Sequence, residues 1–74
     1  MRQSYDKATD TLYIFLREAP AADSREIEPD VVLDVGSDGR PVAYEVQFAS
    51  TKHALVGRLI LEAMAREEPE PEPA

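Results

Sequence analysis

The sequence predicts a small α+β domain, in which an antiparallel β-meander of three to five short strands is packed by one C-terminal α-helix. Two observations lead to this fold class. Short runs rich in β-branched and aromatic residues, separated by turn residues, fill roughly the first two thirds of the chain. The remainder shows apolar residues at the period of about 3.6 that is typical of a helix.

The first two elements are expected to be strands joined by a turn. Arg2 to Tyr5 is a short edge strand, and Asp6 to Asp10 is the turn, because Asp side chains accept hydrogen bonds from nearby backbone N–H groups. The run Thr11–Arg17 is a strand with two apolar faces, which favours a position where both faces are covered. One face carries Leu12, Ile14 and Leu16, and the other carries Tyr13 and Phe15.

Three more strands follow in the prediction. Ser24–Glu28 is a short polar strand with one buried residue, Ile27, and Val31–Val35 is an apolar strand. A hairpin turn at Asp38-Gly39 leads into the run from residue 41 to residue 48, which alternates cleanly. This alternation places Val42, Tyr44, Val46 and Phe48 on one face and Ala43, Glu45 and Gln47 on the other.

A helix capped by Ser50 or Thr51 is expected from Lys52 to about Arg66. Its apolar stripe comprises Leu55, Val56, Leu59, Ile60, Ala63 and Met64. Leu61 falls outside the stripe and is therefore a candidate interface residue. Because proline cannot continue a helix, residues 1–66 form a single domain in this prediction, and the Glu-Pro segment 67–74 is a disordered acidic tail.

Composition excludes several kinds of protein. The chain has 74 residues, no cysteine, one histidine and a formal net charge of −7. Disulfides, thiolate metal sites and histidine-rich metal cages are therefore excluded, and no cofactor is expected. No apolar run is long enough to span a membrane, the first residues lack the apolar run of a signal peptide, and we expect a cytoplasmic location. Because no basic patch is visible, direct nucleic-acid binding is not expected.

The predicted sheet has more apolar surface than one helix can cover. A chain of this size is marginally stable alone, and it has no disulfide to add stability. We therefore expect a homo-oligomer, most simply a dimer. The large aromatic residues are candidate anchors of the core or of that interface. They include Tyr5, Tyr13, Phe15 and Tyr44.

Four carboxylates are candidates for chemistry. Asp6 and Asp10 flank one turn, so they form either a metal or acid–base pair or two turn caps, and capping is the interpretation we favour. Asp34 interrupts an apolar run and needs a partner, for which Arg25 or Arg40 is expected. Glu45 is either a catalytic acid or a polar residue on the face opposite Tyr44, and we favour the second.

Two blocks of the sequence resemble the DUF2283 family of small prokaryotic proteins, over roughly residues 4–51. The first block is the segment from Tyr5 to Ile14, with the pattern Tyr-Asp, a turn, Asp, any residue, Leu-Tyr-Ile. The second runs from Val32 to Ser50, although Ala43-Tyr44 replaces the Gly-Ile of the family and its ending differs. The family has no assigned enzymatic activity. Some members look like partners of small toxin-like proteins, so the resemblance implies an antitoxin-like role.

These observations favour a non-enzymatic protein-interaction module. Its acidic residues would steer a small basic partner protein toward it. The alternative is a small ligand- or metal-binding domain, or an enzyme, that uses carboxylates at a subunit interface. The four carboxylates for this alternative are Asp6, Asp10, Asp34 and Glu45.

Overall fold

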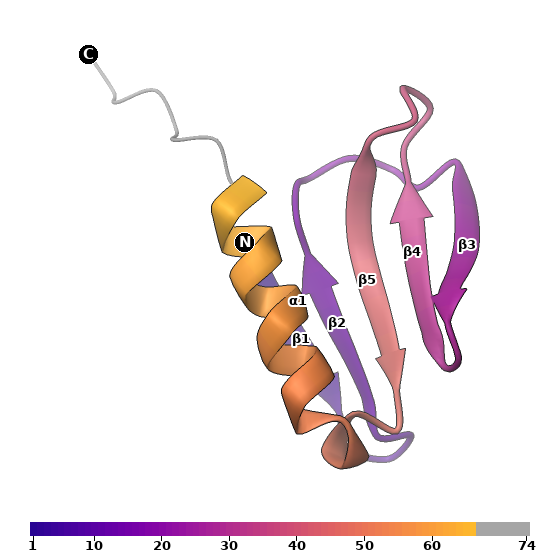
Figure 1. The fold of residues 1–74 in the computed structure, drawn as a ribbon. Helices are drawn as coiled ribbons and strands as arrows, with labels where there is room; N and C mark the ends of the chain where they lie inside the picture. The colour runs from indigo at the N-terminus through magenta and orange to yellow at the C-terminus, as the bar shows by residue number, and fades with distance from the viewer. Residues whose placement is uncertain (67–74) are drawn as a thin grey trace.

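A computed structural model of the protein describes residues 1–66, and the segment 67–74, for which the sequence predicts a disordered tail, lies outside the described residues. The fold is a five-stranded antiparallel sheet followed by one helix, which confirms the predicted α+β class (Figure 1). The elements in chain order are β1 (Arg2–Asp6), β2 (Thr11–Phe15), β3 (Asp23–Glu28), β4 (Val31–Val35), β5 (Pro41–Gln47), the 3₁₀ turn η1 (Ala49–Thr51) and α1 (His53–Arg66).

The strands lie in the order β1-β2-β5-β4-β3. The last strand, β5, is therefore central, between β2 and β4, and each neighbouring pair is antiparallel. The connection from β2 to β3 crosses the sheet past the ends of β5 and β4 (Figure 1). One end of the sheet thus carries the start of β1, the end of β2 and the start of β5. The opposite end carries the β1–β2 and β3–β4 turns and the exit from β5.

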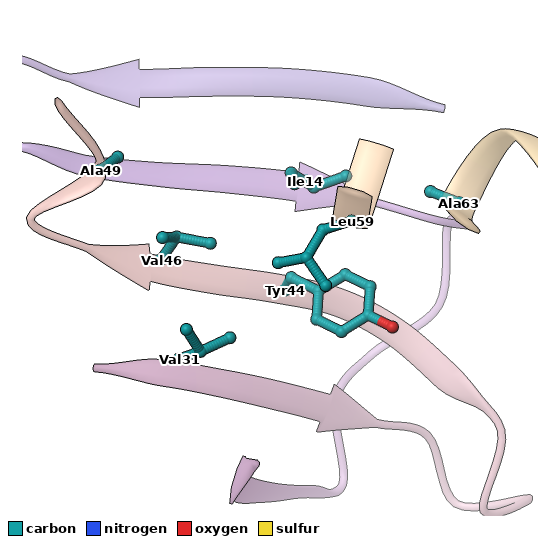
Figure 2. Packing of buried hydrophobic residues seen from close by; sticks show 7 residues of the cluster. All are labelled: Ile14, Val31, Tyr44, Val46, Ala49, Leu59 and Ala63. Carbon is teal, nitrogen blue, oxygen red and sulfur yellow. The ribbon is translucent and has the colours of Figure 1, made fainter. Parts of the chain in front are cut away.

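The register of the central strands gathers the aliphatic side chains on one face, which α1 covers (Figure 1). Ile14 lies opposite Tyr44, and Val46 lies between Leu12 and Val31. Burying a large aliphatic side chain stabilises a fold by about 1.5–3 kcal/mol. The core in Figure 2 therefore attaches the helix to the sheet, and it comprises Ile14, Val31, Tyr44, Val46, Ala49, Leu59 and Ala63.

The other face of the sheet, the outer face, is partly shielded by its own side chains. Tyr13 and Phe15 are half-buried, and their rings stack with centroids 6.2 Å apart. The Arg2 guanidinium lies over the Phe15 ring, 4.4 Å from its centroid, in a cation–π contact. The apolar surplus expected on this face is therefore smaller than the sequence predicts. The more exposed apolar side chains lie elsewhere, on β1, β3 and α1 and directly after β5.

Two residues expected to be buried are exposed. Phe48 does not continue the inner face of β5, because its backbone is left-handed (φ 54°) and turns the chain toward η1. Its side chain is consequently 54% exposed. Ile27 is 45% exposed, because it lies at a register shift between Glu26 and Glu28 of β3. Both departures occur where the strand geometry is interrupted.

The predictions for the helix cap and for Met64 are also wrong. The helix starts at His53, one residue after the predicted start, and the hydroxyls of Ser50 and Thr51 donate to groups outside it. The Thr51 hydroxyl instead donates to the carbonyl oxygen of Phe48 at 2.7 Å, inside η1. Met64, assigned to the buried stripe, is 56% exposed, whereas Leu61 is exposed as expected. The helix therefore buries a narrower stripe than its apolar residues indicate.

Candidate functional site

Asp10 joins the first hairpin to the connection before the helix. Its carboxylate accepts hydrogen bonds from the Tyr5 hydroxyl at 2.6 Å, from the Ser50 backbone N–H at 3.0 Å and from the Ser50 hydroxyl at 2.6 Å. Its backbone oxygen accepts a further bond from the Ala49 N–H at 2.9 Å. We call Tyr5, Asp10 and Ser50 the Asp10 network. It fastens the β1–β2 turn to the exit from β5.

The electrostatics of the Asp10 network fit a structural role. The hydrogen bonds from Ser50 and then from Tyr5 lower the pKa of Asp10 below its ordinary value of 3.8. The hydrogen bond to Asp10 raises the pKa of Tyr5 above its ordinary value of 10.0. Asp10 is therefore an ionised acceptor and Tyr5 a neutral donor at neutral pH. Both carboxylate oxygens of Asp10 accept hydrogen bonds from protein groups.

The Asp6 carboxylate accepts a hydrogen bond from a different backbone group than the Asp10 carboxylate does. Its carboxylate accepts a hydrogen bond from the Ala8 N–H at 3.0 Å, which forms the Asx turn expected from the sequence. The two carboxylates that flank the first turn thus each hold a separate piece of backbone. This geometry favours the capping interpretation over an acid–base pair.

Asp34 and Glu45 meet on the outer face, on neighbouring strands β4 and β5. Asp34 accepts a hydrogen bond from the Ser24 hydroxyl at 2.6 Å. Burial and then the adjacent Asp34 carboxyl raise the pKa of Glu45 above its ordinary value of 4.5. The expectation that Arg25 serves Asp34 is wrong, because the register places Arg25 opposite Leu33, on the other face. Two carboxyls in contact can share a proton.

The remaining sequence candidates lie in different environments. Tyr44 belongs to the core, and its hydroxyl accepts a hydrogen bond from Arg66 at 3.2 Å. Tyr13 and Phe15 lie on the outer face, where Tyr13 pairs with Glu45 across β2 and β5. Leu61 is 68% exposed on α1. The predicted site residues therefore do not converge on one centre.

Exposed apolar residues lie on β1 and on α1. A shallow groove of about 420 Å³ lies between these two elements, and its lining includes Tyr5, Val56 and Gly57. Because residues four and seven positions apart share one side of a helix, Leu61 and Met64 lie on the same side of α1 as Gly57. We call Tyr5, Gly57, Leu61 and Met64 the β1–α1 surface.

A group of arginines at the opposite end of the sheet is a feature that sequence reasoning missed. An open cavity of about 1280 Å³ is lined by Arg2, Arg17, Arg40 and Arg66, four of the eight basic residues of the chain. We call it the arginine cavity. The arginines are far apart in the sequence, and the strand order together with the position of α1 brings them to one cavity. The even spread of basic residues along the chain gave no signal of it.

The chain was compared with protein families, curated proteins and solved structures. A family described as Protein of unknown function (DUF2283) matches residues 2–50. The chain belongs to this family. The match confirms the resemblance seen in the sequence, and it spans all three members of the Asp10 network. No curated protein and no solved structure matches the chain.

Two other kinds of site are not found in the described residues. Within residues 1–66, no group of three or more His, Cys, Asp or Glu side chains is placed to hold a metal ion. The helix in this part of the chain is not long and apolar enough to cross a membrane. Tyr5, Asp10 and Ser50 lie within the residues that match the family, and their hydrogen bonds join the first hairpin to η1.

Proposed function

We propose that this protein is a non-enzymatic protein-interaction module that associates with itself through the β1–α1 surface. The observation that carries the proposal is the exposure of its large apolar side chains: 68% for Leu61, 56% for Met64 and 50% for Tyr5. Removing apolar area from water contributes about 25 cal/mol per Å², so a second copy that covers this surface gains stability. The absence of cysteine is in keeping with a cytoplasmic location.

The edge strand β1 suits such a contact. It keeps an uninterrupted register from Arg2 to Asp6, whereas the other edge strand, β3, has a register shift and is rich in charged residues. Bulges and charges are features that block pairing at sheet edges. In a two-fold antiparallel pairing centred on Ser4, Arg2 of one copy lies opposite Asp6 of the other. Charge complementarity thus favours pairing of β1 with a second β1.

Mass measurement in solution tests the self-association. Sedimentation equilibrium should give a dimer of the 8.2 kDa chain. Leu61→Glu should shift the equilibrium to the monomer, because a charge is then buried in an apolar contact. Ile27→Glu is the matched control, since it places the same charge on an exposed aliphatic side chain of the opposite edge. A wild-type monomer at every concentration, or equal weakening by both variants, contradicts the proposal.

The concrete form of this function is antitoxin-like binding of a small basic protein. The net charge of −7 supports it, because an acidic surface speeds encounter with a basic partner. A tagged copy expressed with the product of the neighbouring gene should retain that protein in a complex of fixed stoichiometry. The complex should weaken as salt concentration rises. Separate elution of the two proteins at low salt contradicts this form of the proposal.

The contact between Asp34 and Glu45 supports a second candidate, a carboxylate-based ligand or metal site. Calcium takes six to eight oxygen ligands in proteins, and this pair supplies only part of such a set. Calorimetric titration with Ca²⁺ and Mg²⁺ distinguishes the candidates. Heat of binding that Glu45→Gln abolishes would favour the metal site, and a titration without heat would favour the interaction module.

A further inference from the structure

We infer that the arginine cavity is a binding site for an acidic peptide, and that its occupant is the segment 67–74 of the same chain. The inference concerns the end of the sheet away from the Asp10 network, and it goes beyond the proposed self-association. It rests on the placement of the arginines, on the position of Arg66 and on the charge of the segment.

The cavity is positive in a protein that is negative as a whole. Four arginines line it, against two acidic residues, Glu18 and Asp34, whereas the whole chain carries a net charge of −7. Its lining also includes the apolar residues Phe15 and Ala43. A site lined by several guanidinium groups and by apolar residues fits a ligand with several carboxylates.

Two of the guanidinium groups are held in position by the fold. Arg2 lies over the Phe15 ring. Arg17 donates to the carbonyl oxygen of Pro41 at 3.0 Å and forms an ion pair with Asp38 at 2.7 Å. A guanidinium has five N–H donors, so the contacts of Arg17 fix the orientation of its guanidinium and use only some of those donors. Fixed groups lose less conformational entropy when a ligand binds.

The segment 67–74 matches the cavity in charge. It contains four glutamates, three prolines and no basic residue. Prolines favour the extended polyproline II conformation, which costs little entropy to fix on binding. The glutamates are separated by prolines along most of the segment, so several carboxylates can contact different arginines. The pattern therefore fits a site whose arginines come from four separate places in the chain.

The segment begins at the cavity. Arg66 lines the cavity and is the last residue of α1, so the segment is joined in sequence to a residue of the cavity lining. An extended chain rises about 3.1 Å per residue, so eight residues can reach about 25 Å from Arg66. Attachment at Arg66 also gives the carboxylates a high effective concentration at the arginines. These relations favour the chain's own segment over a free acidic peptide.

Nuclear magnetic resonance of the full chain tests the inference. The variant that changes Glu67, Glu68, Glu70 and Glu72 to Gln keeps the length of the segment and removes its charge. The arginine Nε–H signals of Arg2, Arg40 and Arg66 should differ between this variant and the wild type, and high salt should abolish the difference. Arg25 and Arg58 are internal controls, because Arg25 lies beside Asp23 and Arg58 beside Glu28, outside the cavity.

A second pair of variants tests the site from the other side. Arg40→Gln should move the backbone amide signals of residues 67–74, whereas Arg25→Gln should leave them unchanged. Superimposable spectra in both comparisons would overturn the inference and would support the disordered tail that the sequence predicts. Signal differences that disappear on dilution would overturn it as well, since the segment would then contact another copy. The mass of the four-glutamine variant reports separately on self-association through the β1–α1 surface.

Discussion

The carboxylate of Asp10 accepts hydrogen bonds from both the backbone N–H and the hydroxyl of Ser50, at 3.0 and 2.6 Å, across 40 positions of the sequence. Within residues 1–66, Asp10 is also one of three residues other than glycine with positive φ, at 53°, so its backbone makes the turn that brings its carboxylate to Ser50. The Tyr5 hydroxyl completes the network from β1. One side chain thus couples the first hairpin to the segment that positions α1.

Replacing Asp10 with Asn should lower thermal stability at neutral pH. Asn tolerates the same positive φ, so the change removes the charge and leaves the turn intact. Because folding lowers the pKa of Asp10 below 3.8, the ionised carboxylate stabilises the fold above that pH, and this contribution is lost as pH falls through the folded-state pKa. The difference in melting temperature between wild type and variant should therefore disappear in acid. Circular dichroism melts over a pH series measure it.

Two further variants define the source of that effect. Ser50→Ala should show part of the effect of Asp10→Asn: a lower melting temperature than the wild type at neutral pH, with a difference that disappears in acid. The reason is that the hydrogen bond from the Ser50 hydroxyl is the first cause of the lowered pKa of Asp10. Asp6→Asn should change stability less, since the Asp6 carboxylate accepts one bond within its own turn. Equal melting temperatures for wild type and Asp10→Asn at neutral pH would show that the network adds nothing to stability.

Gly57→Ala should raise the free energy of unfolding by about 1 kcal/mol. Gly57 lies inside α1, where Ala is favoured over Gly by about 0.8–1.0 kcal/mol. A Cβ built at this position meets no atom within 4 Å, so the added methyl group causes no clash. Urea unfolding measures the gain.

Gly39→Ala is the matched control for this prediction. A Cβ at Gly39 also meets no atom within 4 Å, but the backbone there has φ of 77°, which disfavours an L-residue with a side chain. This variant should therefore lose stability. A loss of stability in Gly57→Ala would mean that the space beside α1 is occupied, as it is in an association through the β1–α1 surface.

The sequence predicts the faces of this fold better than its connections. Alternation along residues 41–47 correctly separates the buried Tyr44 from Glu45, because side chains of a strand point to opposite faces. The pairing of β2 with β5 and the contact of Asp10 with Ser50 depend on the strand order, which has no local signal. The same reason hides the arginine cavity. Phe48 leaves the face that the alternation predicts, because its own backbone is left-handed and the strand ends at Gln47.

Ile14→Val should destabilise the protein by about 0.5–1.5 kcal/mol, the usual cost of removing one buried methylene group. Ile14 is fully buried in the cluster that joins the sheet to α1. Leu61→Ala provides the comparison, because an exposed substitution usually changes stability by less than about 0.5 kcal/mol. Both values come from urea unfolding at concentrations where the protein is monomeric. A larger cost for Leu61→Ala under those conditions would place Leu61 in the core of the monomer.

Glu45→Gln should raise thermal stability at neutral pH. Burial and the neighbouring Asp34 raise the pKa of Glu45 above 4.5 in the folded state, so the fold favours the protonated form. The stability linked to that proton is fully present below the ordinary pKa and is lost as pH rises through the folded-state pKa. Gln is neutral and keeps a donor for Asp34, so the variant avoids this loss. The difference in melting temperature between Glu45→Gln and the wild type should become smaller as pH falls below the pKa of Glu45.

The control for Glu45→Gln is Glu26→Gln on β3. Glu26 pairs with Val32 on the same outer face, but its side chain is exposed. Its replacement should change the melting temperature little at any pH, because an exposed carboxylate away from partners contributes little. Asp34→Asn should lower the pKa of Glu45 in a carbon-13 titration, since it removes the adjacent charge. If Glu45→Gln and Glu26→Gln gave the same pH profile, the two carboxyls on β4 and β5 would not be coupled.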